Sequence, residues 1–121
     1  MKANPSVEEL KALTESLTKG EHVVLLPEEQ EKALVRQYRE GNPDALSALL
    51  EANIRFVVSV AKNYQDKGLD TPELIAAGTK GLVQAAQNFD ETQGFRFLAY
   101  AIWWIRQSIL LRSMDKDEFG V

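Results

Sequence analysis

The segment Asn88–Arg112, NFDETQGFRFLAYAIWWIRQSILLR, contains six of the ten aromatic residues in the chain. No Asp or Glu lies between Glu91 and Asp115, although the chain as a whole carries a net charge of −4. From Gly94 onward the spacing of the apolar residues predicts a helix. The six aromatic residues are Phe89, Phe95, Phe97, Tyr100, Trp103 and Trp104.

This predicted helix has two unlike apolar faces. At about 100° per residue, one face is a narrow aliphatic stripe, and the opposite face is largely aromatic. The aliphatic stripe alone is enough to dock the helix onto a core, so the aromatic face needs a second explanation. The stripe is Leu98, Ile102, Ile105 and Ile109, and the opposite face is Arg96, Tyr100, Trp103, Trp104, Gln107 and Leu111.

Two explanations of the aromatic face remain open at this point. A second element covers it and the rings belong to the core, as expected because large exposed apolar patches are uncommon in monomers. Alternatively, the face is a stacking platform for unpaired bases, which needs flat rings, nearby cations and no carboxylates. In that case Arg96, Arg106 and Arg112 follow the phosphates, and Gln107 hydrogen-bonds an adenine edge.

Helical patterns also fill the rest of the chain. We expect a short helix within residues 1–20, a second from Pro27 that stops at Gly41, and a third over residues 44–64 that Gly68 closes. A fourth starts at Thr71, its predicted N-cap. The predicted buried stripe of the third helix is Leu46, Leu49, Leu50, Ile54, Val57, Val58 and Ala61.

Three polar or small residues inside these helices need a reason. Asn53 is a poor helix-interior residue, and we expect it either to be kept for a functional hydrogen bond or to face solvent or a neighbouring loop. Gly78 and Gly81 each cost about 1 kcal/mol relative to Ala, and close helix–helix approach explains them as a packing feature.

Composition excludes several classes of protein. The chain of 121 residues is one domain, and it has no Cys, no apolar run of about 18 residues and no recognisable catalytic or cofactor motif. We therefore expect a cytoplasmic protein that is not an enzyme, binds no cofactor and does not enter a membrane. Ten of the 18 acidic residues lie in residues 8–51, whereas residues 92–114 hold three Arg and no acid. Weak DNA binding and dependence on a partner follow.

Three stretches resemble one family. NFDETQGFRFLAYAIWWIRQSI is similar to the DNA-melting and recognition segment of primary-type (sigma-70 family) bacterial sigma factors, and EANIRFVVSVAKNY and ELIAAGTKGLVQAAQNFD resemble the two preceding segments, in the family's order and spacing. The resemblance covers about residues 27–112 and implies region 2 of such a factor, an all-α orthogonal bundle of about four to five helices. We expect this domain over residues 21–114, a short helix of unknown role over 1–20 and an acidic tail over 115–121.

The resemblance also implies partners and residues. The domain would bind the β′ coiled coil of core RNA polymerase, recognise the −10 promoter element, separate its strands and hold the non-template strand. Tyr100 and Trp103 would fill the gap left by a flipped adenine, and Asn53 and Phe56 would lie near a second base pocket. The implied DNA-binding residues are Asn53, Phe56, Phe89, Asp90, Phe95, Arg96, Phe97, Tyr100, Trp103, Trp104, Arg106 and Gln107, and the implied polymerase-binding residues are Glu73, Ala76, Ala77, Thr79 and Lys80.

The chain departs from the family in places. Glu73, Ala76, Ala77 and Thr79 stand where the family favours Asp, Gln, Glu and Asn, and an apolar then acidic end replaces a basic helix after Ile109. These departures favour an alternative, a sigma-like interaction module that binds RNA polymerase or a regulator without opening DNA. A third hypothesis is generic single-strand binding without −10 preference. The printed chain ends before the family's later domains, so it is either a fragment or a short relative that cannot direct initiation alone.

Overall fold

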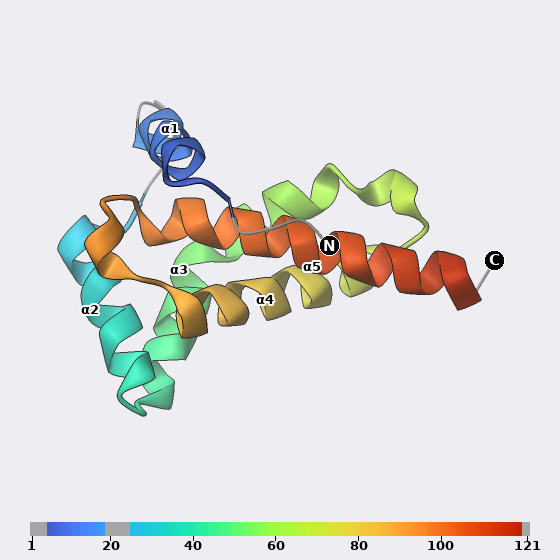
Figure 1. Cartoon of the computed structure of the whole chain (residues 1–121). Helices are drawn as coiled ribbons and strands as arrows, with labels where there is room; N and C mark the ends of the chain where they lie inside the picture. The colour runs from blue at the N-terminus through green and yellow to red at the C-terminus, as the bar shows by residue number, and fades with distance from the viewer. Residues whose placement is uncertain (1–4, 19–24, 120–121) are drawn as a thin grey trace.

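The protein is a bundle of helices, and the computed structural model describes residues 5–18 and 25–119 (Figure 1). For residues 17–18 and 115–119 it describes the helical main chain only. No strand occurs among the described residues, which confirms the all-α prediction. The elements are α1 (Val7–Thr18), α2 (Glu28–Arg39), α3 (Pro43–Lys62), the 3-10 turn η1 (Gln65–Lys67), α4 (Thr71–Asn88), the 3-10 turn η2 (Glu91–Gln93) and α5 (Phe97–Phe119).

The start of α4 corrects one sequence prediction. Its N-cap is Asp70 rather than Thr71, because Asp70 and Glu73 form a reciprocal capping box. The Asp70 carboxylate accepts from the Glu73 N–H at 2.9 Å, and the Glu73 carboxylate accepts from the Asp70 N–H at 3.0 Å. An aspartate with a glutamate three positions later satisfies two backbone donors, which a threonine one position further on cannot match.

The end of α3 lies two residues earlier than predicted. The helix stops at Lys62, and Gly68, with φ of 84°, ends the following turn η1 instead of α3. Gly41, with φ of 107°, follows α2 as predicted. Left-handed backbone of this kind favours glycine because it has no Cβ.

The buried stripe of α3 also differs from the predicted one. Ile54 is 42% exposed, so its prediction as a core residue is wrong. Asn53 lies in the stripe instead, between Leu49 and Val57, and its amide Nδ2 donates to the carbonyl of Leu49 in the same helix at 2.8 Å. The packed stripe therefore has one polar member, whose amide donor is satisfied inside α3.

Two glycines allow α4 and α5 to pack closely side by side (Figure 1). A Cβ on Gly81 would lie 2.6 Å from the carbonyl oxygen of Trp104 and 2.7 Å from the Cα of Ile105. A Cβ on Gly78 would lie 2.8 Å from the Cγ1 of Val57. These distances confirm the packing interpretation of both glycines. They also fix the orientation of α5, whose aliphatic stripe, Leu98, Ile102, Ile105 and Ile109, is fully buried as predicted.

Helix α1 packs on the first part of α5 (Figure 1). Leu10 is 3% exposed and belongs to the common core, and the hydroxyl of Thr14 accepts from the N–H of Arg96 at 3.1 Å. The boundary at residue 20 stays a prediction, as do the other domain limits. His22, most of the expected connector 21–26, and residues 120–121 of the expected acidic tail fall outside the described residues. Within the described ranges no helix is both long and apolar enough to cross a membrane.

Candidate nucleic-acid interface

Six aromatic rings form a continuous series of contacts from the core to the surface of α5. Phe89 lies at the centre, with ring centroids 5.4 Å from Phe97, 6.0 Å from Phe95 and 5.9 Å from Tyr100. Tyr100 continues the series to Trp104 at 6.1 Å, and Trp104 contacts Trp103 at 5.4 Å. Most of these pairs are edge-to-face or tilted, the arrangements that aromatic quadrupoles favour.

The series divides into an inner and an outer half. Phe89, Phe95 and Phe97 precede or begin α5 and are 1%, 6% and 0% exposed, so they support the surface from below. Tyr100, Trp103 and Trp104 are half-buried and lie opposite the aliphatic stripe. We name these three the outer rings. The inner rings are therefore core, whereas the outer rings, which belong to the predicted aromatic face, are only partly covered. Their role in stacking bases stays a prediction.

Helix α1 covers part of this aromatic face. Pro5, Val7 and Leu10 line one side of a shallow recess, and Phe95 and Tyr100 lie on its other side. The Tyr100 hydroxyl donates to the carbonyl of Asn88 at 3.4 Å, a long bond that ties the ring to the end of α4. Tyr100 therefore has one side against α1 and the end of α4, and it is half-buried overall.

Both indole N–H groups lack a hydrogen-bond partner in the described part of the chain. Nε1 of Trp103 and Nε1 of Trp104 are buried, although the two side chains are only half-buried overall. Leaving a buried donor unpaired costs roughly 1–3 kcal/mol. The two indoles thus carry a donor each that no described residue satisfies.

The loop before α5 is organised by Asp90. Its carboxylate accepts from the N–H and the hydroxyl of Thr92 at 2.9 and 2.6 Å, and from the amide of Gln93 at 3.0 Å. These hydrogen bonds, led by the one from the Thr92 hydroxyl, lower the pKa of Asp90 to about 2. Because its carboxylate is occupied in shaping η2, Asp90 supports the loop.

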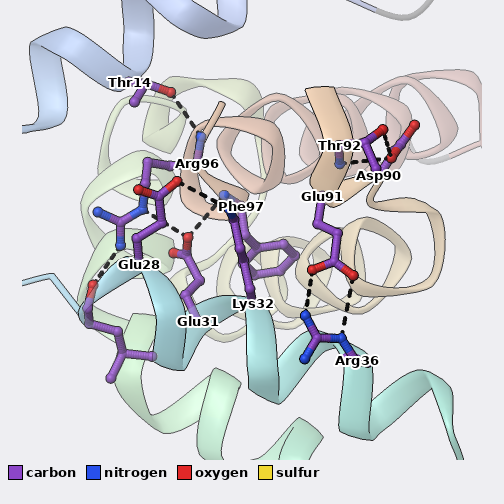
Figure 2. Close-up of polar contacts among 11 residues, drawn as sticks. Thr14, Glu28, Glu31, Lys32, Arg36, Asp90, Glu91, Thr92, Arg96 and Phe97 are labelled. Carbon is purple, nitrogen blue, oxygen red and sulfur yellow. Dashed lines mark hydrogen bonds and ion pairs between the residues drawn. The ribbon is translucent and has the colours of Figure 1, made fainter. Parts of the chain in front are cut away.

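Helix α2 holds this loop from below (Figure 2). Arg36 donates to both carboxylate oxygens of Glu91, at 2.7 Å from Nη2 and 3.4 Å from Nε, and Arg39 donates to the carbonyl of Phe89. The hydrogen bond and the opposite charge raise the pKa of Arg36 and lower the pKa of Glu91. The loop is thereby fixed at its first part.

A buried ion pair fixes the other end of the loop (Figure 2). Nε of Arg96 donates to Oε1 of Glu31 at 2.9 Å, and the two side chains are 10% and 3% exposed. The same oxygen accepts from the N–H of Phe97 at 3.0 Å, and Nη2 of Arg96 donates to the carbonyl of Leu26. Glu31 on α2 thus caps the first turn of α5 across 66 positions of sequence. Arg96, predicted to follow phosphates, is committed to this pair.

The remaining predicted cations differ in availability. Arg106 is exposed and forms no ion pair with a described residue. Arg112 lies 3.4 Å from the carboxylate of Glu73, and Gln107 is half-buried.

Phe56, the predicted neighbour of a second base pocket, lies on α3 apart from the aromatic series. It is half-buried and makes no ring contact with that series within the described residues. Among the described residues, no group of three or more His, Cys, Asp or Glu side chains could hold a metal ion.

The residues predicted to bind polymerase gather in a groove between α4 and α5. Four of the five line it, whereas Thr79 is half-buried and does not. The groove measures about 400 Å³, and α5 supplies its second wall. Its lining residues are Glu73, Ala76, Ala77, Lys80, Gln84, Ser108, Leu111 and Arg112.

Sequence reasoning missed the residues that act across distant segments. Glu31 is one of three acids in the first turn of α2, and its pairing with Arg96 has no sequence signal. Leu111 was placed on the aromatic face, and its approach to α4 was not foreseen. The one clue in the sequence to the burial of Glu31 is that it stands one helical turn before Val35, on the apolar side of α2.

Comparison with known proteins gives a match to one family and similarity to curated relatives. Residues 49–117 match the family described as Sigma-70 region 2, which is more than half of the chain. The RNA polymerase sigma factor RpoS of Coxiella burnetii (strain RSA 493 / Nine Mile phase I) is 44% identical over 93 residues, covering 77% of this chain and 26% of that protein. The chain therefore spans about a quarter of the length of this curated relative.

Proposed function

This chain belongs to the Sigma-70 region 2 family, and we propose from this premise that it recognises the −10 promoter element and holds the non-template strand open. The outer rings Tyr100, Trp103 and Trp104 take up unstacked bases, and Arg106 and Gln107 meet the adjoining backbone and base edges. No chemical bond changes in this process, and the chain is not an enzyme.

One observation carries the proposal: the outer rings continue an aromatic series whose inner half is locked in the core. A ring that is packed from below loses little conformational freedom when a base stacks on it from above. Base–aromatic stacking is worth roughly 1–3 kcal/mol per base, and flipping a base costs a few kcal/mol. Each stacked base therefore offsets much of the cost of its own flipping, which shifts the balance toward open DNA.

The hydrogen bonds and ion pairs around the loop before α5 explain how the outer rings are held in place. Asp90 shapes the loop, Arg36 and Arg39 hold its first part, and Glu31 with Arg96 holds its last part. Phe89, Phe95 and Phe97 then act in DNA binding as buried supports of the outer rings. Asn53 and Phe56 contribute to a second base site on α3 in this proposal.

RNA polymerase is the proposed partner, because the relative named above is an RNA polymerase sigma factor. Glu73, Ala76, Ala77, Thr79 and Lys80 form the proposed contact with the β′ coiled coil. The net charge of −4 makes the free chain a poor DNA ligand, so strand capture strengthens when polymerase is bound. This partner also places the proposed site of action in the cytoplasm.

The test is fluorescence titration with a −10-like non-template oligonucleotide and a scrambled one, with and without core polymerase. Tyr100→Ala and Trp103→Ala are expected to weaken binding of the −10-like strand about 5- to 150-fold each, the equivalent of 1–3 kcal/mol. Tyr100→Phe keeps the ring and is expected to bind nearly as well. Tyr64→Ala removes a half-buried tyrosine outside the aromatic series and serves as the matched control.

Three results decide among the hypotheses. Polymerase-dependent preference for the −10-like strand supports promoter opening. Polymerase binding with no detectable binding of either oligonucleotide supports the interaction module, which the apolar residues Ala76 and Ala77 favour. Equal binding of both strands supports generic single-strand binding. Unfolding of both Tyr100→Ala and Trp103→Ala, judged by circular dichroism, would show that the outer rings are core and would refute the platform.

A further inference from the structure

Helix α1 lies before the residues 49–117 that match Sigma-70 region 2, yet it packs on the start of α5 (Figure 1). Leu10 is 3% exposed in the common core, and Val7 and Leu13, three positions before and after it, pack against that core. Residues at this spacing lie on one side of a helix, so α1 docks by a single apolar face, which also borders the recess beside Tyr100. Family membership leaves the role of α1 open, and its contacts have to indicate it.

One side chain of α1, Thr14, bonds to the main chain at the start of α5 (Figure 2). Its hydroxyl donates to the carbonyl of Leu10 in its own helix at 2.8 Å and accepts from the N–H of Arg96 at 3.1 Å. A hydroxyl has one proton and two lone pairs, so the bond to Leu10 leaves its lone pairs for Arg96. Arg96 directly precedes α5, where N–H groups have no acceptor within the helix. Thr14 therefore supplies from another element an acceptor that α5 lacks.

Arg96 links Thr14 to the outer rings through its own main chain. The carbonyl of Arg96 accepts from the N–H of Tyr100 at 3.4 Å, which is the first hydrogen bond of α5. That distance is long for an N–H···O bond, which usually measures about 2.7–3.2 Å, so the first turn of α5 is only weakly closed by itself. Support from outside the helix therefore decides how firmly this turn holds Tyr100.

We infer that Thr14 is a positioning residue for strand capture: its hydroxyl holds the main chain of Arg96 and thereby sets the orientation of Tyr100. Thr14 itself does not touch the strand. Glu31 supports the same turn from α2 at the next N–H, that of Phe97, so α1 and α2 hold the start of α5 from two elements. The inference rests on the proposed function and adds to it a helix that the family match does not include.

The size of the expected effect follows from the loss of one hydrogen bond. A typical intramolecular hydrogen bond shifts an equilibrium by about two- to tenfold. Without the Thr14 hydroxyl, the fraction of chains whose first turn of α5 is correctly placed falls by up to this factor. The apparent affinity for the strand falls in proportion to the fraction that is competent to bind.

The first measurement is titration of the full chain, together with core RNA polymerase, with the −10-like non-template oligonucleotide. Thr14→Val removes the hydroxyl and is expected to weaken capture about two- to tenfold, whereas Thr14→Ser keeps the hydroxyl and should stay within about twofold of the unaltered chain. Ser113→Ala is the matched control, and it should also stay within about twofold. It removes another hydroxyl, 5% exposed as part of Ser113, that donates to the carbonyl of Lys67 at 3.3 Å near the other end of α5.

The second measurement is amide hydrogen exchange at Tyr100 in the free chain, which needs neither DNA nor polymerase. Thr14→Val is expected to speed this exchange about two- to tenfold, because opening of the first turn of α5 becomes easier by the same factor. Ser113→Ala is expected to leave it unchanged. Urea unfolding of all three variants shows how much of any change comes from a loss of global stability.

Each outcome bears on one claim. If Thr14→Val captures the strand as tightly as Ser113→Ala, or if both lose affinity in proportion to their loss of stability, Thr14 only stabilises the fold and the inference is overturned. If Thr14→Ser is as weak as Thr14→Val, the hydroxyl is not the cause and the inference is overturned as well. Weaker capture without faster exchange at Tyr100 would mean that Thr14 meets the DNA itself, which contradicts the inference. If the unaltered chain shows no preference for the −10-like strand, the proposed function fails, and exchange at Tyr100 alone then decides whether Thr14 positions that residue.

Discussion

Replacing Glu31 by alanine is the sharpest test of how the start of α5 is held. The change removes the carboxylate that pairs with Arg96 at 2.9 Å and accepts from the N–H of Phe97 at 3.0 Å. It leaves a guanidinium that is 10% exposed without its counter-charge, and the first N–H of α5 without an acceptor. Breaking a buried pair in this way costs about 3–5 kcal/mol, because one charge stays buried and uncompensated.

That magnitude is large against the whole fold. A domain of this size is stable by about 5–15 kcal/mol, so Glu31→Ala removes a third or more of the stability of an average domain. With an unfolding entropy of about 2.1 cal/mol/K per residue, 121 residues give a fall of about 12–20 °C in Tm. Circular dichroism during thermal and urea unfolding measures both quantities.

Three further variants separate the contributions of Glu31. Glu31→Gln keeps an oxygen for the Phe97 N–H but loses the charge, so it is expected to fall between the unaltered chain and Glu31→Ala. The double variant Glu31→Met with Arg96→Met replaces both partners by apolar groups and is expected to recover most of the loss. Glu91→Ala breaks the exposed pair with Arg36 in the same loop and is expected to change the Tm far less. A Glu31→Ala protein that unfolds at the same urea concentration as the unaltered chain would refute this reasoning.

Three other predictions concern the glycine contact, the loop and the α4 cap. Gly81→Ala should lower the free energy of unfolding in urea by at least about 1–3 kcal/mol, and by more than Gly78→Ala. The reason is that a Cβ on Gly81 meets backbone atoms, whereas a Cβ on Gly78 meets a valine side chain. Equal losses for the two variants would contradict the close backbone contact at Gly81. Asp90 should titrate with a pKa of about 2 by NMR. The folded pKa of Asp90 lies below the unfolded value of about 3.9, so the contribution of Asp90 to stability is present above pH 4 and is lost as the pH falls from about 4 to 2. Asp90→Asn should therefore flatten the dependence of stability on pH in that window. Asp70→Ala should cost about 1 kcal/mol in the same assay and Thr71→Ala clearly less, and the reverse order would restore Thr71 as the N-cap.

Local patterns predicted most of the helices because each signal lies within one or two turns of sequence. Gly41 ended α2 as expected, and the aliphatic stripe of α5 was placed correctly from its spacing alone. The predictions at Thr71 and at the end of α3 were wrong because a better N-cap, Asp70, and the turn η1 lie only one or two positions away. Ile54 was misplaced because Asn53, one position before it, is satisfied by its own helix and can therefore occupy the core.

The aromatic face of α5 could be predicted from the sequence, whereas the contacts that hold it in place could not, and its role in binding stays a prediction. Tyr100, Trp103 and Trp104 stand out from sequence because three large rings lie opposite an aliphatic stripe on the same predicted helix. Glu31 and Arg96 do not stand out, because their partnership depends on how α2 and α5 meet. The same holds for Leu111 and Ala77, which become two walls of one groove only after α4 and α5 pack together.

The distance in sequence between Glu31 and Arg96 has a consequence for how the protein is made. The two residues are 65 positions apart, so at a synthesis rate of about 5–20 residues per second Arg96 is added roughly 3–13 s after Glu31. During that interval the carboxylate stays hydrated, and its desolvation waits for the arrival of its partner. The first turn of α5 is therefore capped only after it reaches a residue that was made seconds earlier.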